Sequence, residues 1–420
     1  MLVVSTVEPK KIALIHFAYP PNIGGVESMI KEHAQILTTL GYDITVITGS
    51  GEEKDARIKL VVIPELQSVM NFNPFLQEKI LKQGLIDNDF YKLAESIEID
   101  LEKALSGIDT VIVHNMITIV RNLPFISAFK NYVKKYPNKK YFSWTHDHSY
   151  INEFKIKDVD KIANSKFEKD ILTTPIKNLT YILISESFRE PFIKLMGLSD
   201  ANTVVIPNGI DIRHFLEIDD IIWEIIEKYG LIKSFPLILS PVNIMDRKNL
   251  LYCVEIIHYL KKTYPHIKYV ITGQPSKHHS TEAYFENLKT TISQFGLKEN
   301  VLFFNDFLSR ALARTEVHDL YQISDMVFFL SKSENFGLPL LESALTKTPI
   351  LVSDLKVFRE IGGELIRYID YRNVKSEQTA EIVKDFLEQS SRVKLNFRSR
   401  TEYDLKTILK DKFVPLVEKK

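Results

Sequence analysis

The stretch Met326-Val-Phe-Phe-Leu330 is followed by Ser331-Lys-Ser-Glu-Asn335 and then by Phe336-Gly-Leu-Pro-Leu-Leu-Glu342. A short apolar run that leads into a polar loop indicates a buried strand. Pro339 suits the first turn of a helix, where its missing N–H is not needed. The stretch therefore predicts a strand, a loop and a helix start, the repeating unit of doubly wound α/β domains.

The loop between this strand and this helix has the composition of a ligand site. Gly337 allows a ligand to approach the backbone closely, and the free N–H groups of a helix start attract a phosphate or sugar hydroxyls. Glu334 and Glu342, eight residues apart, each offer two oxygen acceptors to hydroxyl groups. We interpret the loop as a sugar- or phosphate-binding site rather than as a surface loop with a capping glutamate.

The same alternation of apolar runs and amphipathic segments continues on both sides of this stretch, which predicts an α/β fold with two doubly wound, Rossmann-like domains. In the first half we predict strands at Ile12–Phe17, Asp43–Thr48, Leu60–Ile63, Thr110–His114, Lys140–Trp144 and Tyr181–Ser185, and helical structure over Val26–Leu40 and most of Asn73–Ser106. In the second half we predict strands at Leu237–Ser240, Lys268–Thr272, Val301–Phe304, Met326–Leu330 and Ile350–Val352.

The turn signal Pro207-Asn-Gly209 divides the two halves. We predict an N-terminal domain over residues 1–200 and a C-terminal domain over residues 201–400. An amphipathic helix over about residues 400–420 could pack back on the N-terminal domain. Ligands bind at the carboxyl ends of parallel strands, so the two domains are expected to face each other across a cleft that holds the site.

Composition excludes several classes of protein. The 420 residues carry 54 basic and 54 acidic side chains, whereas a nucleic-acid-binding domain usually has a basic excess. The single cysteine, Cys253, cannot form an internal disulfide, which favours a cytoplasmic location. No apolar run approaches the roughly 18 residues of a membrane-spanning helix. The start of the chain reads as a first strand rather than as a signal peptide.

A second candidate loop follows the first predicted strand. Pro20-Pro-Asn-Ile-Gly24-Gly25 leads into the helix that begins at Val26. Adjacent glycines at a helix start can hold an anion through backbone N–H groups. The spacing is not the G-x-G-x-x-G fingerprint, so a nicotinamide cofactor is not indicated.

Taken together, these motifs resemble the family 4 retaining glycosyltransferases of the GT-B fold (glycosyl transferases group 1), over nearly the whole chain. Glu334–Glu342 is similar to the family's Glu-x7-Glu signature, Pro207–Asp211 to the segment that enters its C-terminal domain, Pro20–Gly25 to its glycine loop and Trp144–Asp147 to its strand-end histidine. The resemblance implies transfer of a hexose, glucose or mannose, from a UDP- or GDP-sugar to a hydroxyl of a sugar, small-molecule or glycan acceptor, with retention at the anomeric carbon.

The resemblance also implies roles for single residues. Glu342 would bind the ribose hydroxyls, and Glu334 would accept hydrogen bonds from the donor sugar. Gly24 and Gly25 would lie against the diphosphate, and His146 would sit beside the reacting sugar. The remaining donor contacts would come from Asn335, Phe336, Gly337 and Leu338.

The charge that develops on the departing diphosphate must be stabilised by cations and helix starts. The family usually offers an Arg and, five or six residues later, a Lys. Lys248 matches the Lys, but Asn243 stands where the Arg is expected. Arg247 could supply the second positive charge, or it could face solvent while Asn243 hydrogen-bonds the phosphate.

We therefore expect a cytoplasmic, metal-independent hexosyltransferase that needs no cofactor. His146 and His148 lack further ligands at the spacing of a metal site. One alternative is a degenerate, non-catalytic subunit that binds a nucleotide sugar, because of Asn243, and another is an epimerase or phosphorylase on the same fold. Five lysines between Lys130 and Lys140 could contact anionic lipid, but a solvated helix face is the favoured interpretation.

Overall fold

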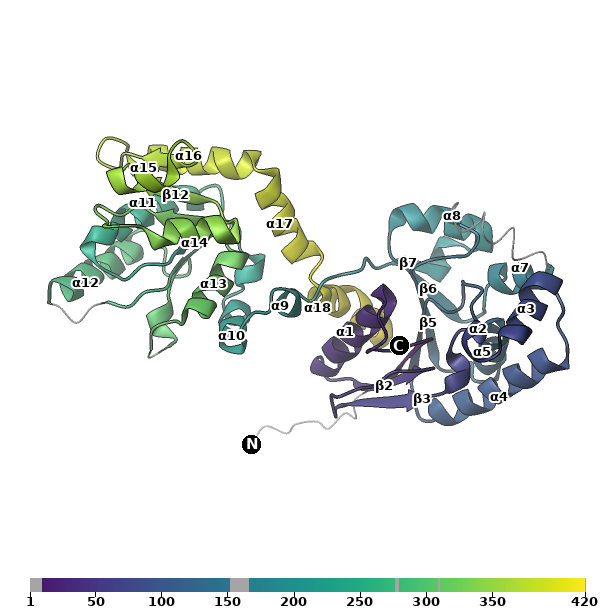
Figure 1. The fold of residues 1–420 in the computed structure, drawn as a ribbon. Helices are drawn as coiled ribbons and strands as arrows, with labels where there is room; N and C mark the ends of the chain where they lie inside the picture. Colours follow the sequence, from purple (N-terminus) through teal and green to yellow (C-terminus); the bar gives the residue numbers. More distant parts are fainter. Residues whose placement is uncertain (1–9, 152–165, 276–278, 309, 420) are drawn as a thin grey trace, which may run out of the picture. The chain divides into compact units, whose positions relative to one another are not determined.

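The computed structural model describes residues 10–151, 166–275, 279–308 and 310–419. The chain divides into two compact units (Figure 1). Unit 1 consists of Met1–Gly209 and Leu405–Lys420, and unit 2 of Ile210–Asp404. Each unit is built on its own parallel sheet with helices between successive strands.

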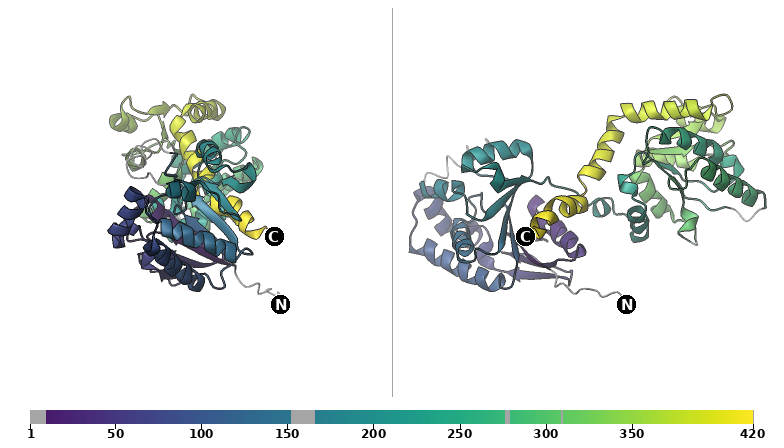
Figure 2. Two further views of the ribbon diagram at one scale, coloured as in Figure 1. Left: turned by 90° about the vertical axis from the view of Figure 1, so that its right-hand side faces the viewer. Right: turned by 180° about the vertical axis from the view of Figure 1, so that it is seen from behind.

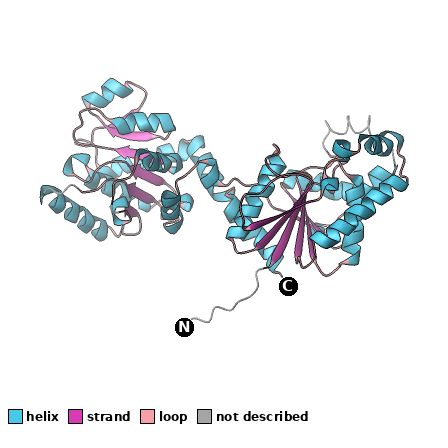
Figure 3. Cartoon of the chain, turned by 60° about the horizontal axis from the view of Figure 1, so that its bottom comes forward, coloured by secondary structure: helices cyan, strands magenta, loops and turns pink. Residues whose placement is uncertain are grey.

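The described part of unit 1 holds a seven-stranded sheet in the order β3-β2-β1-β4-β5-β6-β7. Figure 3 shows strands, in magenta, with helices around them. All neighbouring strands pair in parallel, and Ile12 of β1, an interior strand, pairs with Ile44 on one side and Thr110 on the other. The strands are β1 (Lys11–His16), β2 (Asp43–Thr48), β3 (Ile58–Val62), β4 (Thr110–His114), β5 (Lys140–Thr145), β6 (Leu179–Leu183) and β7 (Thr203–Val205).

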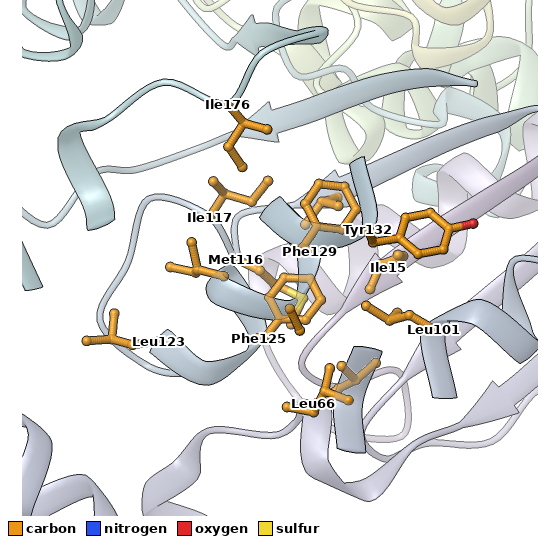
Figure 4. Packing of buried hydrophobic residues seen from close by; sticks show 14 of the residues in the cluster. Ile15, Leu66, Leu101, Met116, Ile117, Leu123, Phe125, Phe129, Tyr132 and Ile176 are labelled. Atoms are coloured by element: carbon orange, nitrogen blue, oxygen red, sulfur yellow. The ribbon is translucent and has the colours of Figure 1, made fainter. Parts of the chain in front are cut away.

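Strand β1, in the interior of the sheet of unit 1, is apolar on both faces because helices cover both faces. Side chains alternate along a strand, so Ile12 and Leu14 enter one apolar cluster while Ala13 and Ile15 enter the other. Figure 4 shows the larger cluster, in which Ile15 lies near Phe129 and Tyr132. The helices before β7 are α1 (Gly25–Thr39), α2 (Val69–Phe72), α3 (Pro74–Gln83), α4 (Asn88–Ala104), α5 (Leu123–Lys135), α7 (Lys166–Thr173) and α8 (Glu186–Met196).

The end of the chain belongs to unit 1. Residues 405–418 form α18 (Leu405–Ile408), a π-helical turn η6 (Leu409–Phe413) and α19 (Val414–Glu418). Leu405, Phe413 and Val417 are buried in the cluster that also contains Ile12, and the ring of Phe413 lies 5.5 Å from that of Trp144. The C-terminal segment, in yellow in Figure 2, thus completes the core on the α1 face of the sheet.

Unit 2 holds a six-stranded parallel sheet, within the described residues, in the order β10-β9-β8-β11-β12-β13. Its strands are β8 (Leu237–Ser240), β9 (Lys268–Ile271), β10 (Val301–Phe303), β11 (Met326–Phe329), β12 (Ile350–Ser353) and β13 (Arg367–Ile369). Its helices are α9 (Ile212–Phe215), α10 (Asp220–Lys228), α11 (Leu250–Lys261), α12 (His279–Gln294), α13 (Arg314–Ile323), α14 (Leu338–Thr346), α15 (Lys356–Gly362), α16 (Ser376–Gln389) and α17 (Ser391–Glu402). The predicted α/β class, with two doubly wound sheets, is confirmed.

Several elements differ from the sequence-based prediction. The strand predicted at Tyr181–Ser185 begins two residues earlier, at Leu179, and β7 and β13 were not predicted as strands. The long helical prediction from Asn73 to Ser106 is two helices, because Gly84 ends α3 in a left-handed conformation with φ +62°.

The lysine run of α5 and β5 is largely engaged with unit 1 itself. Lys130 Nζ donates to the carbonyl of Ile171 at 2.8 Å, and Lys135 pairs with Glu102. Lys139 and Lys140 donate to backbone carbonyls, that of Val417 among them at 2.7 Å from Lys140. Most of these charges therefore hold helices together rather than form one free basic face. Within the described ranges, no helix has both the length and the apolar character to cross a bilayer.

Candidate functional site

The loops after β8 and β11 form a pocket of about 460 Å³ in unit 2. These strands are neighbours in the sheet, so parallel pairing brings their carboxyl ends, and the loops that follow, side by side. A backbone hydrogen bond of 2.7 Å from Lys332 N to the carbonyl of Arg247 ties the two loops together. The pocket is lined by Arg247, Lys248, Phe329, Ser333, Glu334, Asn335, Phe336, Gly337, Leu338 and Pro339.

Glu334 is the centre of this pocket, because three side chains donate to its carboxylate. Lys248 Nζ donates to Oε1, and Arg247 Nη1 donates to Oε2 at 3.1 Å. Ser331 Oγ donates to Oε1 at 2.8 Å. Lys248 also lies over the Phe329 ring, 5.3 Å from its centre. Two cations and one carboxylate are thus held on one wall.

The electrostatics keep this group of charges ionised. Burial alone would raise the pKa of Glu334, but hydrogen bonds from Lys248 and Ser331 and the charge of Arg247 hold it below its ordinary value. Burial lowers the pKa of Lys248, and the ion pair with Glu334 opposes that shift. The pocket therefore presents a net positive charge beside a fixed acceptor, a combination that suits a phosphate next to hydroxyl groups.

The start of α14 forms the other wall of the pocket. Gly337 has φ +128°, and a Cβ there would lie 2.7 Å from Cε1 of Phe358. Pro339 lies in the first turn, as predicted, and no side chain caps the helix. Phe336 and Leu338 are about half exposed. The open helix start is therefore available to an anion or to hydroxyl groups.

Glu342 does not share this pocket but lines a second one, of about 350 Å³, at the same edge of the sheet. Pro241 after β8 and Thr272 after β9 also line it. Tyr321 of α13 donates from its hydroxyl to Glu342 Oε2 at 3.1 Å, and Arg314 Nη2 donates to Oε1 at 3.3 Å. The carboxylate is thus held in place before any ligand arrives.

Asn243 is exposed in the loop after β8 and is not among the residues that line the Glu334 pocket. This loop packs tightly on Gly273, where a Cβ would lie 2.4 Å from Cα of Asn243. Arg247, in the 3-10 helix η4 (Asp246–Lys248), reaches Glu334 instead. Arg247, rather than Asn243, therefore lies beside Lys248 in this pocket.

In unit 1, His146 follows β5 at the carboxyl edge of the sheet. The backbone N–H groups of His146 and Asp147 donate to Asn115 Oδ1 at 3.2 and 3.0 Å. Asn208 Nδ2 lies 3.5 Å from His146 Nδ1. Burial and the nearby His16 lower the pKa of His146 to about 4, so the imidazole is neutral at pH 7. Nε2 of His146 is buried and has no hydrogen-bond partner among the described residues.

Gly24 and Gly25 stand at the start of α1, where Glu27 folds back over them. A Cβ at Gly24 would lie 2.0 Å from Glu27 Oε2, whereas one at Gly25 would meet no atom within 4 Å. Glu27 Oε1 lies 3.7 Å from His16 Nε2, and this contact lowers the pKa of Glu27. The glycine loop therefore has a carboxylate beside it, which the sequence analysis did not anticipate.

The predicted site residues thus fall into groups. Unit 2 brings together Arg247, Lys248, Glu334 and the loop to Leu338, with Glu342 in the second pocket, while Gly24, Gly25 and His146 belong to unit 1. The sequence analysis missed Ser331, Tyr321 and Arg314. Ser331 had a usable signal, since it is the first polar residue after a predicted strand, but Tyr321 and Arg314 had none.

Residues 221–402 match the family "Glycosyl transferases group 1". The mannosylglucosylglycerate synthase of Petrotoga mobilis is 23% identical over 383 residues, which cover 85% of this chain and 86% of that protein. The serotype-specific mannosyltransferase WbdA of Escherichia coli is 38% identical over 69 residues, which cover 16% of this chain and 8% of that protein. Among solved structures, a glycosyltransferase from Rickettsia africae aligns with a TM-score of 0.38 at 17% identity, covering 98% of this chain and all of that one.

Proposed function

We propose that this chain transfers a hexose from a nucleotide sugar to an acceptor hydroxyl, with retention at the anomeric carbon, because residues 221–402 match the family of group 1 glycosyltransferases. The observation that carries the proposal is the carboxylate of Glu334 held between Lys248 and Arg247, beside the uncapped start of α14. Two cations and a helix start supply the charge that a diphosphate needs, so no metal or other cofactor is part of the proposal.

Two related proteins are named for mannose, and we therefore propose mannose as the first hexose to test. The donor's nucleoside would occupy the Glu342 pocket, with the carboxylate on the ribose hydroxyls. Its hexose would lie by Glu334 and the loop from Asn335 to Leu338. The ribose is common to UDP- and GDP-sugars, so Glu342 does not select between them.

The proposed reaction is a front-face substitution. The acceptor oxygen forms its bond to the anomeric carbon on the face from which the diphosphate leaves, as the bond from that carbon to the phosphate oxygen breaks. The leaving phosphate takes the acceptor proton. Lys248 and Arg247 stabilise its developing charge, and His146 would sit beside the reacting sugar.

The direct test mixes the purified protein with GDP-mannose, UDP-glucose and related donors and a panel of sugar and small-molecule acceptors. Release of nucleoside diphosphate is followed, and the anomeric configuration of the product is read by NMR. We expect turnover with one donor class and a product of the donor's configuration. An inverted product would contradict retention, and product without diphosphate release would support the epimerase or phosphorylase alternative.

Lys248→Ala is the decisive variant. Loss of one preorganised cation should reduce kcat by about 10²–10³-fold. Lys332→Ala is a matched control, because Lys332 lies in the same loop but pairs with Asp246 at 2.7 Å outside the pocket. Full activity of Lys248→Ala would contradict the role of Lys248 in stabilising the leaving diphosphate. If the wild-type protein binds the donor but shows no turnover, and Asn243→Arg gives turnover, the non-catalytic alternative would be supported.

A further inference from the structure

Unit 2 contains a third pocket, of about 370 Å³, at the opposite edge of its sheet. Met326, Ile350 and Arg367, the first residues of β11, β12 and β13, line it. Both pockets described above lie at the carboxyl ends of the strands. The third pocket is therefore separate from the proposed transfer site, and its volume is within the range of about 300–1,000 Å³ that small-molecule sites occupy.

The walls of this pocket are mainly apolar. Leu340 and Ala344 of α14 form one side, and Ile382 and Phe386 of α16 form another. Leu365 also lines the pocket and is 91% exposed. An apolar ligand would cover this leucine and remove its side chain from water.

Three cations line the same pocket: Lys347, Arg367 and Arg392. No Asp or Glu is among the residues that line it. In the described part of the chain, none of the three side chains makes an ion pair or a hydrogen bond. By contrast, Arg359 binds Asp354 at 2.6 Å and Arg400 binds Asp325 at 2.6 Å. An apolar pocket with three uncompensated positive charges complements a molecule with an apolar body and an anionic head.

We propose that this pocket binds a long-chain carboxylate, a fatty acid, with its chain between α14 and α16 and its head at the guanidinium groups of Arg367 and Arg392. The planar guanidinium matches a carboxylate through paired N–H donors. The proposal goes beyond the transfer reaction and does not depend on it, because the pocket shares none of the residues assigned to the donor.

The test is calorimetric titration of the full-length protein with octanoate, decanoate and dodecanoate below their micelle concentrations. Each added methylene should tighten binding by roughly fourfold while the chain still fits the pocket. Dodecanol, which lacks the charge, and dodecyltrimethylammonium, which reverses it, should bind at least tenfold more weakly than dodecanoate. Equal affinity for dodecanol, or no dependence on chain length, would overturn the proposal.

Variants of residues that line the pocket test whether dodecanoate binds there. Replacing both arginines (Arg367→Gln with Arg392→Gln) should weaken dodecanoate binding at least tenfold, and Ala344→Phe should abolish it by filling the pocket. Arg372→Gln is the matched control, an exposed arginine of unit 2 outside the pocket. Circular dichroism and the melting temperature verify that each variant is folded. Wild-type affinity in folded Ala344→Phe, or an equal loss in Arg372→Gln, would show that the ligand binds elsewhere.

Discussion

At the scale of single residues, Tyr321 of α13 holds the carboxylate of Glu342 on the neighbouring helix α14. Its hydroxyl donates to Glu342 Oε2 at 3.1 Å, and its ring is buried. Burial and the neighbouring Glu342 raise the pKa of Tyr321 far above its ordinary value, so the hydroxyl remains a donor at every working pH. Glu342 therefore meets a ligand in one orientation rather than in many.

Tyr321→Phe should raise KM for the nucleotide sugar about tenfold and leave kcat nearly unchanged. A hydrogen bond to a charged group contributes about 1.5–3 kcal/mol, and Arg314 still holds the other oxygen of Glu342. Steady-state kinetics measures kcat and KM separately. Tyr368→Phe, which loses a hydroxyl bonded to the Gly363 carbonyl, is the control. A fall in kcat at constant KM would show that Tyr321 acts on the reaction rather than on donor binding.

Gly337→Ala should destabilise the loop that carries the sugar contacts. The residue has φ +128°, which a side chain rarely adopts, and the new Cβ would lie 2.7 Å from Phe358. We expect a loss of about 1–3 kcal/mol of unfolding free energy, measured by urea denaturation, and weaker donor binding. Gly363→Ala has φ +51° but open space around its Cβ, so it should lose less. Equal losses would mean that the contact with Phe358 does not matter.

At the scale of elements, α17 is fastened to the sheet of unit 2 by a buried ion pair. Arg400 Nη2 donates to Asp325 Oδ2 at 2.6 Å and to the Ser234 carbonyl at 2.9 Å. Asp325 also accepts from the backbone N–H of Leu237 at 2.7 Å, at the start of β8. Helix and sheet therefore meet at one carboxylate.

Arg400→Met should lower the unfolding free energy by about 3–5 kcal/mol, because it leaves the buried Asp325 charge without a positively charged partner. The double variant with Asp325→Asn should lose less, since no buried charge remains. Urea denaturation of both proteins gives the comparison. If the double variant loses as much as the single one, packing rather than charge explains the effect.

Strands made of consecutive apolar residues could be predicted from the sequence. Strands that form only because they pair with a neighbouring strand could not. β11 is a run of four apolar residues, and β8 has three apolar residues before Ser240; both strands are completely buried in the sheet, and such runs are visible in the sequence. β13 has three residues at the edge of the sheet and begins with the exposed Arg367, so its only signal is pairing with β12. Glu334 and Lys248 were each assigned to the donor site through a resemblance, but their ion pair was not predicted. Tyr321 reaches Glu342 only because α13 packs on α14.

At the scale of the whole molecule, unit 1 buries several histidines whose rings are neutral at pH 7. Burial lowers the pKa of His33 to about 3 and that of His148 to about 4, and it holds the pKa of His114 well below its ordinary value. Both ring nitrogens of His33 and of His114 lack hydrogen-bond partners within the described chain. These rings pack with Trp144, whose centre lies 4.5 Å from that of His33.

The unfolding free energy should therefore fall as the pH is lowered below about 6.5, the ordinary pKa of histidine in an unfolded chain. The unfolded chain takes up protons there while the folded rings of His33, His114, His146 and His148 remain neutral, so each contributes a slope of up to about 1.4 kcal/mol per pH unit. Urea denaturation at pH 7.5, 6.5 and 5.5 measures it. His33→Leu should reduce the slope and stabilise the protein at pH 5.5, since it removes two unpaired nitrogens, whereas His266→Gln, at an exposed position, should leave the slope unchanged. An unaltered slope in His33→Leu would show that this ring is not among the groups whose protonation opposes folding.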